Sequence, residues 1–401
     1  MHIGLIREEK KPYDKRVAFS PKQCFDLLQN HPELQITVQP SPHRCFPDAE
    51  YLQAGCALSE DLSACEILLG IKEVPKESLI ANKTYCFFSH TIKKQDYNRA
   101  MLQEILKKQI RLIDYECLTW ENGSRIIGFG RFAGIVGTHN GLLAYGEKTK
   151  QYHLEPAWKC FDYKEMLSHY NHFELPPIKI ALCGDGRVAH GALELLNFLK
   201  IREVTSRAYI HEQFNEPVYV HLRTDQLYEH KNNSPFDKSY FYRNPEEYFS
   251  TFNQFYPVTD ILLNAIFWNE SIPRHFSLED MAKPEFNIKV IADISCDIDG
   301  SVPATVRATT IEDPVYGWDQ FLQKETKPYL PKTVDLMTVS NLPCELSRDA
   351  SEEFGALFIR HILPSVLGPD PEKILDRATV TEAGKLHGKF SYLQDFADGK
   401  E

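Results

Sequence analysis

Short apolar segments alternate with amphipathic segments along most of the chain, and this alternation constrains the fold more than any other feature. In the first third, strand-like apolar runs are expected at 2–6, 34–40, 66–75, 84–90 and 110–116. Segments with helical spacing separate them at 21–30, 48–56 and 95–109. Repeated strand–helix–strand units indicate a parallel sheet between layers of helices, so the predicted class is α/β.

The length of 401 residues exceeds that of one typical core and predicts two domains. A long helix is expected at 128–150, where glycines and other small residues favour close packing of the two domains. A new strand–helix unit opens at 176–201, and strands return at 260–267 and 288–295. The stretch at about 207–257 is polar and aromatic, and we interpret it as an insertion.

The composition limits the partners of the chain. A net charge of -11 argues against nucleic acid as a partner. No apolar run approaches the ~18 residues of a membrane-spanning helix, so no membrane partner is expected. Ten scattered cysteines without a C-x-x-C pair suggest free thiols in a reducing cytoplasm and no metal site. A small molecule is the expected ligand, and the oligomeric state stays open.

A dinucleotide-binding motif follows the strand predicted near residue 180. Gly184-x-Gly186-x-x-Ala189 stands between this strand and a helix. Gly184 would allow the tight turn, Gly186 would let a pyrophosphate approach, and Ala189 would let helix and strand pack closely. The alternative is a plain tight turn between strand and helix.

The sequence leaves the choice between NAD and NADP open. An acidic residue that would hold the ribose hydroxyls is not evident ~20 residues after the motif. Arg207 stands near that distance, and Arg223 and Asp225 follow after a longer gap. An arginine there could meet a 2′-phosphate, or it could simply be a surface residue at the end of a strand.

Charged and polar residues follow several predicted strands of the first domain: Arg16, Lys72, His90 and Arg125. Because the carboxyl ends of parallel strands share one edge, such residues can face one ligand. Partial burial would lower the pKa of Lys72 towards that of a useful base, and histidine suits proton transfer. Arginines bind carboxylates in bidentate fashion. Taken singly, each of these residues could equally be structural or solvated.

Several segments resemble those of lysine-forming saccharopine dehydrogenases, in the alanine dehydrogenase and transhydrogenase superfamily. They are "REEKKPYDKRVAFSP", "ILLGIKEVP", "FFSHTIKKQ", "ENGSRIIGFGRFAG", "VIADISCDIDG" and "SNLPCELSRDASEEF". The resemblance runs in order over nearly the whole chain outside about 207–257. It implies oxidation of saccharopine with NAD to lysine and 2-oxoglutarate, with NAD slightly favoured over NADP.

The resemblance also implies roles for individual residues. Lys72 would be the base for the secondary amine of the substrate, and His90 would assist the attack of water. The substrate contacts would be Arg16, Lys11, Gln95, Arg125 and Phe129, with Glu73 tuning the base. The implied cofactor contacts are Gly184, Gly186, Arg187, Ala189, Arg223, Ala265, Ile266, Phe267, Asp297, Ser340, Asn341 and Leu342. Asp293 and Asp297 could instead serve only to fix their loop.

Two positions depart from the family pattern. Ser124 replaces a common arginine before Arg125, and Ser340 replaces a common aspartate near the nicotinamide. Two alternative functions therefore stay open. One is an alanine dehydrogenase or another amino-acid dehydrogenase, and the other is a non-catalytic NAD(P)-binding sensor.

The predicted architecture is a pair of Rossmann-like domains with an interdomain cleft. The substrate and catalytic domain would comprise 1–135 and about 345–401, where a C-terminal helix returns to it. The dinucleotide-binding domain would comprise about 136–344, including the insertion.

Overall fold

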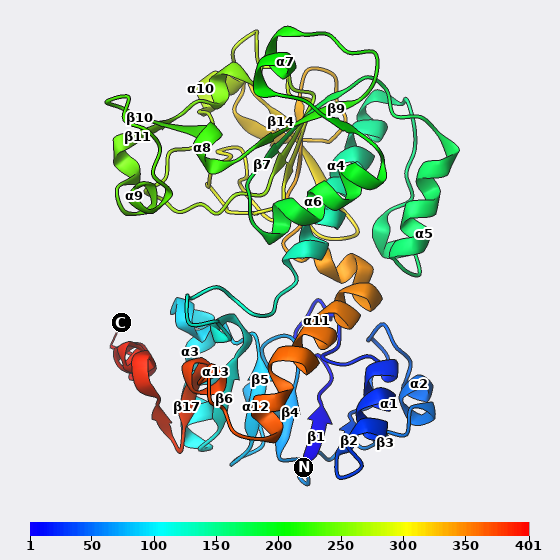
Figure 1. The fold of residues 1–401 in the computed structure, drawn as a ribbon, viewed down its shortest axis with the longest axis vertical. Coiled ribbons are helices and arrows are strands. Elements are labelled where there is room, and N and C mark those ends of the chain that lie inside the picture. Colours follow the sequence, from blue (N-terminus) through cyan, green and yellow to red (C-terminus); the bar gives the residue numbers. More distant parts are fainter. Residues whose placement is uncertain (401) are drawn as a thin grey trace. The chain divides into compact units, whose positions relative to one another are not determined.

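The computed structural model describes residues 1–400, which form two compact units. Unit 1 contains Met1–Phe129 and the chain from Ser347 onward, and unit 2 contains Gly130–Leu346. Each unit has one eight-stranded sheet with helices packed around it (Figure 1). The predicted α/β class is confirmed.

The sheet of unit 1 has the order β18-β17-β6-β5-β4-β1-β2-β3. Its six strands from β3 to β6 are parallel, whereas β17 and β18 extend it in antiparallel fashion. The strands are β1 (His2–Leu5), β2 (Gln35–Val38), β3 (Ala57–Leu58), β4 (Ile67–Leu69), β5 (Thr84–Phe87), β6 (Arg111–Asp114), β17 (Thr379–Glu382) and β18 (Lys385–Leu386). The helices are α1 (Pro21–Asn30), α2 (Asp48–Gln53), α3 (Asp96–Lys107), α11 (Ser347–His361), α12 (Leu363–Leu367), α13 (Ile374–Ala378) and α14 (Gln394–Ala397).

The C-terminal part of unit 1 differs from the single helix expected after residue 345. After α11 the chain forms further short helices and then β17, which pairs with β6 at the sheet edge. The α11 helix packs against the loop after β1, where Ser351 Oγ accepts a hydrogen bond from the Val17 N–H at 2.9 Å. The C-terminal segment therefore both completes the sheet and supports the charged loop.

The sheet of unit 2 has the order β15-β14-β16-β13-β12-β7-β9-β8. Its main strands are β7 (Lys179–Cys183), β8 (Arg202–Glu203), β9 (Val218–Leu222), β12 (Ile261–Asn264), β13 (Val290–Asp293), β14 (Val315–Asp319), β15 (Lys324–Thr326) and β16 (Val334–Met337). A separate hairpin pairs β10 (Tyr228–His230) with β11 (Tyr248–Ser250). The helices are α4 (Gly130–Thr149), α5 (Tyr163–Ser168), α6 (Arg187–Phe198), α7 (Ser206–His211), α8 (Thr224–Leu227), α9 (Lys238–Arg243) and α10 (Leu278–Met281).

The stretch interpreted as an insertion is in part an integral piece of this sheet. Residues Val218–Leu222 form β9, which is buried and pairs in parallel with β7. Only the chain around the β10–β11 hairpin leaves the sheet. The β9 strand was missed because its five residues lie between polar segments and contain a histidine.

The long helix α4 packs tightly against α6 (Figure 1). A Cβ atom at Gly134 would lie 1.9 Å from the Val188 carbonyl oxygen, and one at Gly191 would lie 1.9 Å from the Arg131 carbonyl oxygen. Larger side chains would therefore force the helices apart, so the small residues serve close packing of two helices within unit 2. No helix among residues 1–400 is long and apolar enough to cross a membrane.

Candidate active site

The loop after β1 holds a buried ion pair. Arg16 is 4% exposed, and its guanidinium binds the Asp14 carboxylate through Nε to Oδ1 at 2.9 Å and through Nη2 to Oδ2 at 2.6 Å. Burial alone would raise the pKa of Asp14, but the charge and hydrogen bonds of Arg16 hold it well below its ordinary value. Arg16 is therefore a fixed cation rather than a solvated surface residue.

Two stacked aromatic rings, one of them from the C-terminal segment, support the same arginine. The Arg16 guanidinium carbon lies 4.1 Å from the centroid of the Phe129 ring. Phe129 in turn stacks on Phe354 of α11, with ring centroids 4.8 Å apart. The two sequence-predicted residues Arg16 and Phe129 thus lie together. Lys11, the other substrate contact predicted in this loop, is not buried. Its side chain is exposed, and its Nζ lies 5.7 Å from the centroid of the Tyr13 ring.

Lys72 follows β4 and is half-buried. Burial, followed by the charge of Arg16, lowers the pKa of Lys72. Glu8 fixes the backbone here, because its carboxylate accepts hydrogen bonds from the Ile71 N–H at 2.6 Å and the Lys72 N–H at 2.8 Å. Burial raises the pKa of Glu8 to about 8, although these two N–H donors favour its ionised form. Lys72 therefore lies on a backbone segment that Glu8 fixes, and the pKa of its amine is shifted towards that of a base.

His90 follows β5 and is joined to Glu73. His90 Nδ1 lies 2.7 Å from Glu73 Oε1, and Lys10 Nζ lies 2.9 Å from the same oxygen. Burial would raise the pKa of Glu73, but the hydrogen bonds from His90 and Lys10 lower it to about 2. His90 also has a φ of 53°, a left-handed conformation that is rare for residues other than glycine and is frequent at functional sites.

The other predicted arginine, Arg125, is paired with the carboxylate of Glu116. Arg125 Nη2 donates to Glu116 Oε1 at 2.8 Å, and Lys93 Nζ lies 3.4 Å from the same oxygen. Gln95 is exposed and accepts a hydrogen bond from the Tyr97 hydroxyl at 2.8 Å. Glu73 Oε2 and Glu116 Oε2 are both buried without a hydrogen-bond partner among residues 1–400.

Sequence reasoning missed three carboxylates of this site: Glu8, Asp14 and Glu116. Each lies within a segment that was singled out for its cations or its strand. Asp14 stands two residues before Arg16, and Glu116 stands two residues after the end of β6. The sequence does show these acidic residues close to the predicted cations or strand ends. Which acidic residue pairs with which cation, however, depends on three-dimensional contacts.

In unit 2, the glycine motif forms the expected turn between β7 and α6. Gly184 has a φ of +123°, and a Cβ atom there would lie 2.4 Å from the Ala265 carbonyl oxygen. The buried His221 of β9 holds this turn, with Nε2 2.7 Å from the Gly184 carbonyl oxygen.

The start of α6 offers the room that a pyrophosphate needs. Gly186 caps α6, and a Cβ atom there would meet nothing within 4 Å. Ala189 is fully buried, whereas Arg187 is exposed in the first turn. The turn therefore fits a dinucleotide. Backbone atoms pack closely against Gly184, and the space beside Gly186 at the N-terminus of α6 is open.

The other predicted cofactor residues follow the ends of neighbouring strands. Arg223 comes directly after β9 and is exposed. Ala265, Ile266 and Phe267 follow β12, and Phe267 is 68% exposed. Ser340, Asn341 and Leu342 follow β16, where Ser340 is exposed and Leu342 is buried.

The two aspartates after β13 have different surroundings. Asp293 is buried and accepts hydrogen bonds from Asn264 at 2.8 Å and Thr305 at 2.6 Å, so it ties the ends of β12 and β13 together. Asp297 is partly exposed, and burial together with the charge of Asp293 raises its pKa to about 6. Asp293 therefore has a structural role, and Asp297 stays a candidate for the cofactor side.

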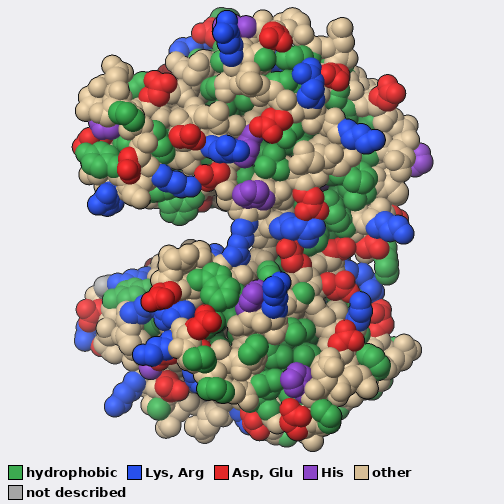
Figure 2. All heavy atoms as spheres, in the orientation of Figure 1, with side chains coloured by type: hydrophobic (Ala, Val, Ile, Leu, Met, Phe, Trp, Pro, Cys, Tyr) green, Lys and Arg blue, Asp and Glu red, His purple; other side chains and the backbone are tan. Residues whose placement is uncertain are grey.

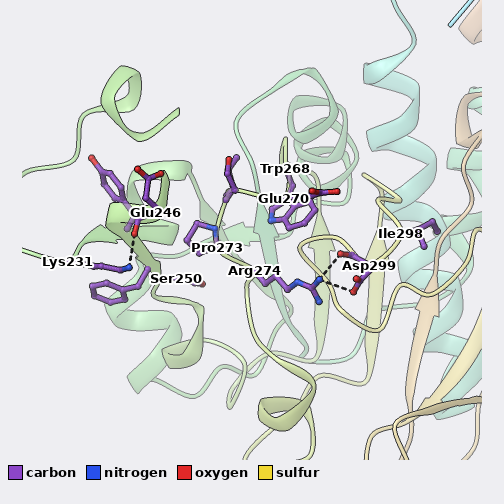
Figure 3. Close-up of a pocket in the computed structure, with 13 residues that line it drawn as sticks. Lys231, Glu246, Ser250, Trp268, Glu270, Pro273, Arg274, Ile298 and Asp299 are labelled. Carbon is purple, nitrogen blue, oxygen red and sulfur yellow. Dashed lines mark hydrogen bonds and ion pairs between the residues drawn. The ribbon is translucent and has the colours of Figure 1, made fainter. Parts of the chain in front are cut away.

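A separate hollow of about 810 Å³ lies in unit 2 (Figure 3). Its wall includes Lys231, Trp268 and the ion pair between Arg274 and Asp299, whose Nη2 and Oδ1 atoms are 2.9 Å apart. None of the predicted cofactor residues lines it. On the visible face of each unit, lysines and arginines are interspersed with acidic side chains, so no single-sign field dominates that face (Figure 2).

Sequence comparison identifies relatives of both units. Residues 4–136 match the family model of the alanine dehydrogenase/PNT N-terminal domain. The whole chain is 29% identical to the mitochondrial alpha-aminoadipic semialdehyde synthase of Rattus norvegicus and covers 48% of that protein. It is 25% identical to the NAD(+), L-lysine-forming saccharopine dehydrogenase of Schizosaccharomyces pombe, over 89% of this chain and 91% of that one. The resemblance predicted from the sequence is confirmed.

The chain spans about half the length of the semialdehyde synthases that it matches. Among solved structures, an L-alanine dehydrogenase matches with a TM-score of 0.64 at 14% identity, covering 99% of both chains. A transhydrogenase from Sinorhizobium meliloti matches with a TM-score of 0.58 at 13% identity, covering 97% of this chain and 100% of that one. These structures share the fold. Together, the likenesses support an oxidoreductase of the amino-acid dehydrogenase type.

Proposed function

We propose that this chain is a nicotinamide-dependent oxidoreductase that interconverts saccharopine with L-lysine and 2-oxoglutarate. The observation that carries the proposal is the cluster of unit 1. Lys72, with a lowered pKa, is next in sequence to Glu73, which pairs with His90, and its pKa is also affected by the buried cation Arg16. The similarity to saccharopine dehydrogenases over about nine-tenths of both chains supports the choice of substrate.

The types of residue in the cluster suit this substrate. Saccharopine carries three carboxylates and one secondary amine, so it needs fixed cations and one base. Arg16 and Arg125 would bind carboxylates, and Arg16 is held rigid by Asp14 and Phe129. Lys72, in its neutral form, would accept the proton of the amine, and the lowered pKa makes this form more accessible.

The oxidative reaction needs a second proton-transfer group after the carbon–nitrogen bond has become an imine. Water adds to the imine carbon, and the carbinolamine then collapses with cleavage of the carbon–nitrogen bond. His90 would take a proton from the water and deliver one to the departing lysine amine. Glu73 orients the imidazole through its contact with Nδ1 at 2.7 Å, which leaves Nε2 for the reacting atoms.

The nicotinamide cofactor would supply the acceptor for the hydride when bound. Gly184, Gly186 and the first turn of α6 would hold its pyrophosphate. The strand next to β7 is followed by Arg223 rather than by a carboxylate, and an arginine at this place accommodates a 2′-phosphate. We therefore propose NADP as the preferred cofactor, although the family resemblance slightly favoured NAD.

The decisive experiment follows NADH and NADPH oxidation with L-lysine plus 2-oxoglutarate, and in parallel with pyruvate plus ammonia. We expect oxidation that requires lysine and 2-oxoglutarate together and that is faster with NADPH. Oxidation with pyruvate and ammonia alone would instead identify an alanine dehydrogenase. Binding of dinucleotide without turnover in any mixture would favour the sensor.

Variants connect this activity to the cluster. We expect Lys72→Met and His90→Gln to lower kcat by about 10²–10⁴-fold while dinucleotide binding is retained. Lys22→Met is a matched control, because Lys22 is an exposed lysine of the same unit on α1. Arg223→Ser should reduce the preference for NADPH over NADH without affecting the rate at saturating NADH.

A further inference from the structure

The hairpin of β10 and β11 is a built structure and not a loose loop. It lies outside the main sheet of unit 2 and carries α9 between its strands (Figure 1). A two-stranded hairpin alone is marginally stable in water. Here Phe241 of α9 anchors it, with ring centroids 4.8 Å from Tyr228 and 5.1 Å from Tyr248, and all three rings are buried. The position of α9 is therefore set by packing.

One ion pair connects α9 to the glycine motif. Lys238 Nζ lies 2.9 Å from Asp185 Oδ2, and Asp185 is the residue between Gly184 and Gly186. The hydrogen bond to Asp185 raises the pKa of Lys238, so the lysine stays charged. An exposed pair adds little to stability, but it links the hairpin directly to the turn that would hold the pyrophosphate.

A small cavity lies where the hairpin meets this turn. It measures about 80 Å³, and its wall combines the glycine turn, Thr224 after β9, residues 265–267 after β12, and Phe241 and Tyr242 of α9. The rings of Tyr242 and Phe267 meet edge to face, with centroids 6.1 Å apart. Both rings are exposed, at 39% and 68%, although both also line the cavity.

We propose that Tyr242 and Phe267 bind the adenine base of the dinucleotide, with the Lys238–Asp185 pair linking the packed α9 to the glycine turn. The inference rests on the proposed function, since it requires a dinucleotide at the glycine motif. In such folds the adenosine half extends from the pyrophosphate towards the strand beside the motif, which here is β9. The cavity lies on that side, between the ends of β7, β9 and β12.

The chemistry of the two rings fits a purine. A purine is flat and apolar on both faces, and aromatic side chains stack on it without reading its edge. The cavity is smaller than the ~300–1,000 Å³ of typical ligand pockets, so the base must separate the two rings as it enters. The exposed position of both rings permits this movement with little loss of packing.

The test compares ligands with and without adenine. ADP and NADPH carry the base, and nicotinamide mononucleotide lacks it. Dissociation constants would be measured by calorimetry for wild type, Tyr242→Ala, Tyr242→Phe and Phe267→Ala. Tyr240→Ala is the control, because Tyr240 lies on the same helix and is similarly exposed but does not line the cavity.

We expect Tyr242→Ala and Phe267→Ala each to weaken ADP and NADPH by about tenfold, as the loss of one stacked ring predicts. Tyr242→Phe and Tyr240→Ala should bind like wild type, and binding of nicotinamide mononucleotide should not change in any variant. Lys238→Met and Asp185→Asn should each weaken ADP by about two- to threefold, and the double variant should be no weaker than either. Thermal unfolding of each variant reports whether it is folded.

The outcomes separate this inference from the proposed function. If wild type binds NADPH and Tyr242→Ala and Phe267→Ala bind it within about twofold of wild type, the aromatic site is wrong while the proposed function stands. Equal weakening of ADP and nicotinamide mononucleotide would also overturn it, because the rings would then act through the shape of the unit. Absence of dinucleotide and ADP binding in wild type would overturn both.

Discussion

Replacing Asp14 with asparagine tests whether the buried pair with Arg16 organises the loop after β1. Both side chains are nearly inaccessible, and two hydrogen bonds of 2.9 and 2.6 Å join them. Removing one member of a buried pair costs ~3–5 kcal/mol, because the other charge is left uncompensated. Asparagine keeps one acceptor, so we expect a loss near the lower value, about 3 kcal/mol.

The loss can be measured as a shift in the thermal unfolding of unit 1. For a unit of this size, 1 kcal/mol corresponds to ~2–4 °C, so Asp14→Asn should lower the midpoint by about 10 °C at pH 7. Asp26→Asn is the control, because Asp26 is an exposed aspartate of the same unit on α1. The variant should also raise KM for the carboxylate substrate more than it lowers kcat, since Arg16 would bind a substrate carboxylate and take no part in the bond-breaking steps.

The pH dependence adds a second readout. Because Arg16 holds the pKa of Asp14 below its ordinary value, the stabilisation is complete above about pH 4 and is lost as the pH falls through the folded-state pKa. The difference between wild type and variant should therefore be constant from pH 7 to about 5 and shrink in more acidic solution. A midpoint within about 2 °C of wild type at pH 7 would refute the reasoning, because breaking an ion pair this deeply buried must lower the stability of the unit.

Three further predictions concern unit 2. Burial raises the pKa of Glu345 from 4.5 to about 8, so the folded unit retains a proton that the unfolded chain has released, and stability should fall as the pH rises through this range. Glu345→Gln keeps the acceptor for Asn140 Nδ2, at 2.8 Å in wild type, and should flatten this slope in unfolding titrations; an unchanged slope would show that Glu345 is not its source. Gly184→Ala should destabilise unit 2 by about 1–3 kcal/mol, because the φ of +123° is strained for alanine and the new Cβ atom would collide with the Ala265 carbonyl oxygen. Wild-type stability of this variant in denaturant titrations would contradict the described conformation of the turn. Gly186→Ala should keep stability but weaken dinucleotide binding by about tenfold or more, since its methyl group would enter the open space at α6; tight binding in this variant would remove Gly186 from the pyrophosphate site.

The fold class followed from the periodicity of the sequence because buried parallel strands require nearly continuous apolar runs. Runs such as Ile67–Leu69 and Ile261–Asn264 were found where the structure has β4 and β12. The strand β9 was missed, since five residues within a polar stretch give no clear period. The antiparallel pairing of β17 with β6 was also missed, because pairing between residues 379 and 113 depends on contacts distant in sequence.

The sequence by itself determined which strand ends carry the candidate site residues. A glycine motif after a strand specifies a turn, and Lys72 and His90 after successive strands specify one edge of a parallel sheet, because these features depend on local geometry. Only the tertiary structure decided which charges are paired. Asp14 pairs with Arg16 within one loop, whereas Glu116 with Arg125 and Lys238 with Asp185 pair between segments that the fold brings together. The strength of such pairs depends on burial and distance, and neither can be read from the order of residues.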